Sequence, residues 1–190
     1  TLKTKSFRTA KVSFPTYVVD NGGDIDLPNE SWEYKYTDDL IIFGGGNGQP
    51  QNNNELNILC QDVIETAQKY SAKFIYTLGG FHTNRVLKNK PRTYVTTTSK
   101  GLRKQMEKLE LEMTPQKSLI TGFNGLILGF AKKYEIQGIG MYGELNKPEI
   151  PQYRAAISII KTIEKLTYRK FGSTEELEML AQEVDQKFRN

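Results

Sequence analysis

The chain has 190 residues, a length typical of one ordinary domain. Its aromatic share is 11%, with ten Tyr and nine Phe, which excludes an intrinsically disordered protein because such chains are poor in aromatic residues. The net charge is +4 and the pI is near 9.0. One cysteine, Cys60, and one histidine, His82, exclude a disulfide framework, a cysteine-based zinc site and a polyhistidine metal centre. We therefore expect no metal and no cofactor.

The location of the protein and the type of its partners are indicated by the distribution of apolar and basic residues. No apolar run is long enough to span a membrane, and the first residues lack the apolar core of a signal peptide, so we expect a cytoplasmic protein with no membrane partner. The basic excess lies mostly between Arg85 and Lys108. It suits phosphates or an acidic partner, or it is the solvated face of a loop and a short helix. No RNA-binding aromatic signature or zinc-finger spacing accompanies it, so we do not expect nucleic acid as the partner.

Several segments are rich in β-branched and aromatic residues and are bounded by glycine, proline or asparagine, a pattern that predicts strands. Pro15 interrupts the first of them, which favours an edge position or a break. Turn residues, including Gly22 and Gly23, follow over 19–30. The predicted strands cover 10–20, 39–46, 73–80, 91–98, the start of 117–134, and 135–144.

Apolar residues at three-four spacing predict helices between these strands. The clearest helix begins at Leu56, after a polar loop whose asparagines can cap it. A long helix begins after Pro151 and stops at Gly172. Ser173, with Glu176 three residues later, is typical of a capping box that starts a last helix. The predicted helices cover 56–70, 99–109, the end of 117–134, 152–171 and 173–188.

The alternation of strands and helices predicts an α/β fold. We expect a three-layer α/β/α sandwich with a mainly parallel central sheet and a C-terminal helical appendage. We further expect a single domain over 1–190, in which 1–171 form the core and 172–190 form the C-terminal helix.

Glycine-bearing turns follow four of the predicted strands, at the edge of the sheet where open parallel sheets bind ligands. Glycine lets the backbone approach a ligand, and a following helix offers free N–H groups to an anion. The clearest turn lies in 121–130, TGFNGLILGF. No G-x-G-x-x-G motif between a strand and a helix and no P-loop accompanies these turns, so backbone geometry alone is the alternative explanation. The candidate ligand-binding residues are Gly45, Gly80, His82, Gly122, Asn124, Gly125 and Glu144.

No constellation of catalytic residues is visible in the sequence. There is no G-x-S-x-G nucleophile elbow, and no pair of carboxylates stands out as a general acid and base. His82 lies near a predicted strand end, where it is either a catalytic residue or a surface residue. Glu144 follows the last strand, where it either binds a ribose or a cation or is a solvated turn residue. Cys60 lies on the apolar stripe of its helix and is best explained as a core residue. The sequence names no catalytic residue and favours a protein that is not an enzyme.

Four segments carry a resemblance to a known family. A strand ends in glycine and is followed by Gln-Pro (39–50), and a T-L-G-G strand end comes next (74–82). A G-x-x-G-L-x-L-G-x-A helix leads to a G-E turn (119–144), and an Ala-Ala helix follows (151–166). In this order the segments resemble the proteasome assembly chaperone 2 family, especially its archaeal members.

The resemblance implies a Rossmann-like fold similar to that of nucleoside phosphorylases, without an established catalytic site. It also implies a non-enzymatic chaperone that forms a homo-oligomer and binds proteasome α subunits or related partners. The alternative is a nucleotide- or phosphometabolite-binding enzyme or sensor that uses the glycine turns.

The chain departs from the pattern of this family in three places. The strand and glycine-rich turn that usually precede the region matching Phe14–Asp20 are absent or truncated, and Gln152 stands where the family tends to carry Asp. The last residues, 187–190, read KFRN and lack the penultimate Tyr of the tail by which some archaeal relatives engage the proteasome. The last departure argues against direct proteasome activation by the chain as printed, but none of the three changes the expected fold.

Overall fold

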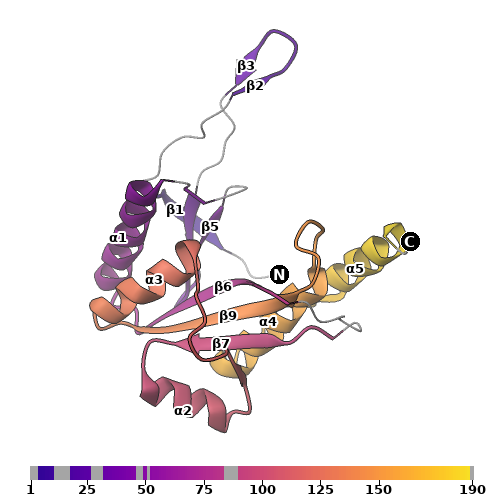
Figure 1. Ribbon diagram of the computed structural model, residues 1–190. Helices are drawn as coiled ribbons and strands as arrows, with labels where there is room; N and C mark the ends of the chain where they lie inside the picture. The colour runs from indigo at the N-terminus through magenta and orange to yellow at the C-terminus, as the bar shows by residue number, and fades with distance from the viewer. Residues whose placement is uncertain are drawn as a thin grey trace.

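The structure is a computed structural model, and it describes residues 4–10, 18–26, 32–45, 49–50, 52–83 and 90–188. Strands and helices alternate along much of the chain (Figure 1). The strands are β1 (Lys5–Thr9), β2 (Val19–Asp20), β3 (Ile25–Asp26), β4 (Trp32–Tyr36), β5 (Ile41–Gly45), β6 (Phe74–His82), β7 (Thr93–Thr97), β8 (Glu112–Met113) and β9 (Gln137–Leu145). The helices are α1 (Asn53–Lys69), α2 (Lys100–Lys108), α3 (Gly122–Lys133), α4 (Tyr153–Thr167) and α5 (Glu175–Lys187).

The central sheet has four strands in the order β6-β9-β7-β8. β6 pairs with β9 in parallel and β7 pairs with β8 in parallel, whereas β7 and β9 are antiparallel. The sheet is therefore mainly parallel, as predicted. Strand β9 lies at its centre, and residues 138–144 of this strand are buried.

Alternate residues of β9 face the two outer layers, because side chains alternate along a strand. On one face, the backbone of Gly138 and Gly140 lies directly under Leu128 of α3. On the other face, Ile139 and Met141 pack in a cluster that includes residues of α2 and α4. The sheet thus has α3, with α1 against it, on one face and α2 and α4 on the other, which confirms the three-layer sandwich (Figure 1).

A second sheet, β1-β4-β5, is antiparallel and was not predicted. Its central residue, Tyr34, is 1% exposed and belongs to a core cluster with Leu59, Ile64 and Ile127. This cluster joins the second sheet to α1 and α3. The strand predicted over 10–20 falls largely outside the described residues, and within it only Val19 and Asp20 are seen as strand.

Strands β2 and β3 form a hairpin that projects from the body of the molecule (Figure 1). The backbone N–H of Asn21 donates to the carbonyl oxygen of Asp24 at 2.9 Å. Between them, Gly22 and Gly23 have φ values of 79° and 100°, which only glycine adopts easily and which tight hairpin turns require. The turn chemistry in this part of the sequence is therefore confirmed.

Helix α1 confirms its predicted cap, because the side chain of Asn52 accepts a hydrogen bond from the Asn54 N–H at 2.8 Å. Two other boundaries were wrong. Helix α4 ends at Thr167 instead of continuing to Gly172, because Tyr168 adopts a left-handed conformation with φ 54°. Helix α5 begins at Glu175 with Thr174 as its N-cap and no side-chain cap hydrogen bond, so the predicted capping box does not form. The Ser173 hydroxyl accepts from the Glu175 N–H at 3.1 Å instead.

The strand predicted at the start of 117–134 is also wrong. Residues 118–120 have no strand pairing and lead directly into α3. The reason is a close backbone approach: a Cβ atom on Gly125 would collide with the carbonyl oxygen of Ile120. The segment is therefore held by the first turn of the helix and not by a neighbouring strand.

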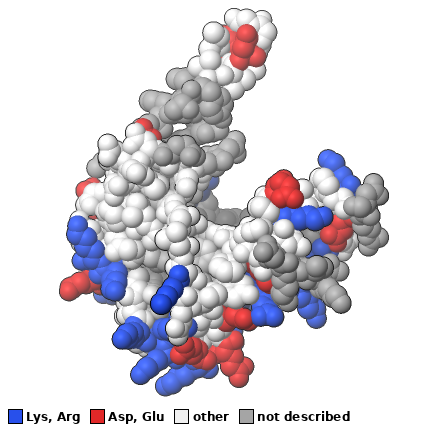
Figure 2. Space-filling model, viewed as in Figure 1, with Lys and Arg blue, Asp and Glu red and all other residues white. Residues whose placement is uncertain are grey.

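Charges are unevenly placed on the surface (Figure 2). Blue side chains gather at the lower end of the view, over α2, whereas the tip of the projecting hairpin carries red. This part of the predicted basic segment is thus exposed; residues 84–89 of that segment lie outside the described residues. Of the helices in the described ranges, none combines the length and the hydropathy needed to cross a bilayer.

Candidate functional site

The start of α3 is the clearest of the predicted ligand turns, and a side chain of the protein itself fills it. The Phe123 N–H donates to Oε1 of Gln49 at 2.8 Å. A Cβ atom on Gly122 would lie 2.7 Å from the Gln49 amide, and Gly122 has φ 72°. Gln49 follows β5, so it connects the end of that strand to the helix. One of the N–H groups that could hold an anion is therefore already bound by the chain.

Asn124, in the same turn, contacts β6. Its Nδ2 donates to the carbonyl oxygen of Leu78 at 2.9 Å. A Cβ atom on Gly79 would lie 2.8 Å from this Nδ2 and 3.2 Å from the ring of Tyr142. The glycine at 79 therefore makes room for the asparagine. The side chain of Asn124 therefore has a structural role, because it binds α3 to β6.

Two buried hydroxyl groups lie on β6 and β9, the strands that α3 covers. Thr77 is 5% exposed and Tyr142 is 4% exposed. Within the described part of the chain, neither hydroxyl oxygen has a hydrogen-bond partner. Burial raises the pKa of Tyr142 above its ordinary value, so the phenol stays neutral at physiological pH. Both hydroxyl groups are therefore buried and uncharged at physiological pH.

Glu144 is neither a solvated turn residue nor a free ligand group. It is fully buried, and its Oε2 accepts a hydrogen bond from the Arg92 N–H at 3.1 Å. Its own N–H donates to the Arg92 carbonyl oxygen at 2.9 Å. The buried carboxylate thus fixes the segment before β7 to the end of β9. An interpretation of Glu144 as an exposed turn residue is therefore wrong. A role of Glu144 in binding a ligand stays a prediction.

The remaining candidates are placed along two different sheets. Gly80 and His82 are exposed near the end of β6, and parallel pairing with β9 brings them to the same edge as Glu144. A Cβ atom on Gly80 would collide with the side chain of Leu145. Gly45 ends β5 in the other sheet, with φ 144°. The structure therefore groups three candidates at one edge and groups Gly122, Asn124 and Gly125 at the start of α3. Gly45 pairs with Trp32, whose ring lies 5.5 Å from that of Phe123, between centroids.

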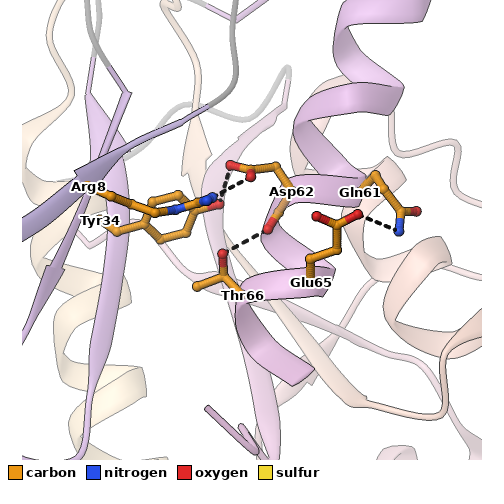
Figure 3. Close-up of polar contacts among 6 residues, drawn as sticks. All are labelled: Arg8, Tyr34, Gln61, Asp62, Glu65 and Thr66. Atoms are coloured by element: carbon orange, nitrogen blue, oxygen red, sulfur yellow. Dashed lines mark hydrogen bonds and ion pairs between the residues drawn. The ribbon is translucent and has the colours of Figure 1, made fainter. Parts of the chain in front are cut away.

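A second buried polar cluster joins β1, β4 and α1 (Figure 3). Asp62, whose side chain is 1% exposed, forms an ion pair with Arg8 and accepts a hydrogen bond from the Tyr34 hydroxyl at 2.9 Å. The Arg8 guanidinium lies over the Tyr34 ring, 4.5 Å from its centroid. Thr66 donates to the Asp62 carbonyl oxygen at 2.8 Å. Burial raises the pKa of Tyr34 well above its ordinary value, so it remains a donor to the carboxylate. Nε of Arg8 is buried and has no hydrogen-bond partner among the described residues. The other contacts of the cluster fasten β1 to α1.

Metal ligands and a reactive cysteine are not found in the described ranges. No group of three His, Cys, Asp or Glu side chains there is arranged to hold a metal ion. Cys60 is fully buried in the core cluster, and burial raises the pKa of its thiol to about 12. A thiol in this environment is a poor nucleophile at neutral pH.

Comparison with known proteins identifies the family. The model of the PAC2 family matches residues 3–190. The chain belongs to the PAC2 family. A relative from Methanocaldococcus jannaschii, the uncharacterized protein MJ1210, is 30% identical over 129 residues, which are 68% of this chain and 46% of that protein. The chain thus matches less than half the length of this relative.

Solved structures share the fold at low sequence identity. Pyrococcus furiosus PbaB, an archaeal proteasome activator, superposes with a TM-score of 0.81 at 22% identity and covers 98% of this chain and 81% of its own. P. furiosus PbaA, an archaeal homologue of a proteasome-assembly chaperone, superposes with a TM-score of 0.75 at 19% identity, and the match covers 92% of this chain and 70% of PbaA. A proteasome-assembly chaperone homologue from Mycobacterium tuberculosis superposes with a TM-score of 0.72 at 10% identity, and the match covers 98% of this chain and 82% of the homologue. All three solved structures therefore share the α/β fold of this chain.

Sequence reasoning missed the residues that fill the site. In the sequence, Gln49 stands out only as part of the Gln-Pro that follows the glycine run. Its position shortly after the end of a predicted strand is the one feature that could have pointed to it. Arg92 acts through its backbone, so no pattern of side chains reveals it. Both residues lie far along the chain from the residues they contact, 74 and 52 positions away respectively.

Proposed function

We propose that this PAC2 family member is a non-enzymatic, cytoplasmic chaperone-type protein that associates with itself and binds proteasome subunits, the α subunits among them. The observation that carries the proposal is the superposition of 98% of the chain on an archaeal proteasome activator at a TM-score of 0.81. The family match over residues 3–190 supports it.

The geometry of the strand-end turns favours a binding surface over a small-molecule pocket. Gln49 and Asn124 use their amide groups to hold α3 in place, so a ligand would have to displace both. Apolar side chains are exposed close to this corner. Leu78, whose carbonyl oxygen binds Asn124, is 50% exposed, and Leu119, three residues before α3, is 88% exposed. Exposed leucines around a closed corner suit contact with another protein.

The proposal is tested by binding of the complete chain to purified proteasome α subunits, measured by co-purification and by biolayer interferometry. The wild-type protein is expected to retain α subunits. The double variant L78D/L119D is expected to weaken binding by about tenfold or more, because it places charge on the apolar rim. M179D on α5 is the matched control, since Met179 is also exposed, at 63%. Failure of the wild-type chain to bind α subunits or complete 20S particles would overturn the proposal.

The alternative function, binding of a nucleotide or a phosphorylated metabolite at the glycine turns, makes a separate prediction. A ligand that binds only the native state raises the melting temperature. We expect nucleosides, nucleotides and phosphate to leave the melting temperature of the wild-type protein unchanged, because Gln49 already accepts the hydrogen bond of the Phe123 N–H. A saturable rise would favour the alternative.

A further inference from the structure

The hairpin formed by β2 and β3 exposes apolar side chains away from the body of the protein (Figure 1). Val18 is 53% exposed, Val19 is 40% exposed and Ile25 is 65% exposed. A two-stranded hairpin on its own is marginally stable at best in water. An arm that presents two open strand edges and three apolar side chains is therefore suited to being covered by another protein surface.

The same hairpin is acidic. Asp20, Asp24 and Asp26 lie within it, and residues 18–26 contain no Lys or Arg. Asp20 accepts from the Gly23 N–H at 2.7 Å, and Asp26 accepts from the Asn21 side chain at 3.0 Å. These contacts stay inside the hairpin. Among the described residues, none of the three carboxylates forms an ion pair, so the arm carries uncompensated negative charge.

A complementary basic surface lies on α2. Lys100, Lys104 and Lys108 recur every four residues, which places them on one face of the helix, and all three are exposed. Leu102 and Met106 on the opposite face are buried. Arg103, by contrast, is paired with Glu107 at 2.9 Å. In the described part of the chain no carboxylate is paired with the three lysines, which we call the lysine stripe.

The acidic hairpin and the lysine stripe lie at opposite ends of the molecule, so they cannot meet within one copy (Figures 1 and 2). Pairing two hairpins around a two-fold axis would bring six carboxylates together, and pairing two stripes would bring six lysines together. Both arrangements are opposed by like-charge repulsion. A hairpin on the stripe of another copy joins opposite charges instead.

We infer that copies of this chain associate head to tail, with the β2–β3 hairpin of one copy docked on the lysine stripe of the next. The inference rests on the self-association in the proposed function and assigns the two surfaces that carry it. A head-to-tail contact made once between each pair of copies is heterologous, and it builds a closed ring when the rotation between copies closes and a filament when it does not. A two-fold dimer that makes the same hairpin–stripe contact twice, reciprocally, uses the same two surfaces.

Charge reversal of each surface tests this arrangement by sedimentation velocity. The wild-type chain is expected to sediment as an oligomer that dissociates as salt is raised. The variants D20K/D24K/D26K and K100E/K104E/K108E are each expected to lose the oligomer and sediment as the 21.7 kDa monomer. An equimolar mixture of the two is expected to reassemble, because each reversed hairpin then meets a reversed stripe and each native hairpin meets a native stripe.

A matched control separates this effect from net charge. The variant D38K/E149K/E183K raises the charge by the same amount as the hairpin reversal, at exposed acidic residues elsewhere, and it is expected to keep the oligomer. Far-UV circular dichroism establishes that each variant is folded. An oligomer that survives either reversal, a mixture that stays monomeric, or a monomeric wild-type chain would overturn the docking arrangement. Binding of α subunits, measured in parallel on the wild-type chain, reports separately on the proposed proteasome partner.

Discussion

Two glycines of α3 experience opposite environments one turn apart. A Cβ atom on Gly125 would collide with the carbonyl oxygen of Ile120, whereas a Cβ atom on Gly129 would meet nothing within 4 Å. The first glycine is there because the backbone of the preceding segment approaches the helix. The second has no such requirement and only carries the entropic penalty of glycine in a helix.

The two positions therefore predict opposite effects of the same substitution. Gly125→Ala is expected to lower the free energy of unfolding by about 1–3 kcal/mol through overpacking. Gly129→Ala is expected to raise it by about 0.5–1 kcal/mol, because alanine is the better helix former. Urea unfolding of both variants measures the two changes. Equal effects would mean that the Ile120 carbonyl does not constrain the start of the helix.

The buried thiol of Cys60 makes the free energy of unfolding fall as the pH becomes alkaline. Burial raises the pKa of its thiol from 9.0 to about 12, so the folded state holds this proton over a range in which the unfolded state releases it. The stabilisation is complete below pH 9 and is lost as the pH rises toward 12. At about pH 10 the loss is expected to be about 1.4 kcal/mol. Urea unfolding at pH 7.5 and pH 10 measures it, with Cys60→Ala as the control that lacks this contribution. Rapid labelling of Cys60 by a thiol reagent in the native protein would contradict the buried state.

At the scale of elements, the sequence pattern predicted those helices and caps that depend on neighbouring residues alone. Helix α1 has a continuous apolar stripe and an asparagine cap, and both appear in the structure. The end of α4 was missed because Tyr168 takes a left-handed conformation without being glycine. The antiparallel direction of β7 could not be predicted, since strand periodicity is the same in both directions. The filling of the candidate site was unpredictable for a similar reason: the contact between Gln49 and Phe123 depends on how distant segments pack.

Arg154 of α4 binds two carboxylates of α5. Arg154 donates from Nε to Glu178 at 3.1 Å and from Nη1 to Asp185 at 2.8 Å, and its side chain is 19% exposed. Arg154→Lys keeps the charge but loses the fork that reaches both carboxylates. Loss of about 1 kcal/mol is expected to speed amide exchange in α5 about fivefold. Hydrogen–deuterium exchange with mass spectrometry measures this, and α1 in the same sample is the internal control. Unchanged exchange in α5 would show that its apolar contacts alone hold it.

At the scale of the whole molecule, two apolar clusters stabilise the fold on opposite faces of the central sheet. One contains Tyr34 and Ile127, and the other contains Val95 and Met141. No residue of the β2–β3 hairpin belongs to either cluster, and residues 18–26 are all exposed. The arm that is proposed to join copies is thus separate from the structure that keeps each copy folded.

This separation predicts that assembly can be removed without loss of folding. Replacing residues 18–26 by nine Gly and Ser residues is expected to shift the melting temperature by less than about 2 °C, because no buried contact is lost. Oligomers gain stability by mass action, so the comparison is made by differential scanning calorimetry in the K100E/K104E/K108E background, where both chains are expected to be monomeric. In the native background the same replacement is expected to abolish the oligomer seen by sedimentation. A fall of several degrees in the monomeric background would mean that the hairpin packs on the body after all, and that its exposed valines and isoleucine are needed for folding.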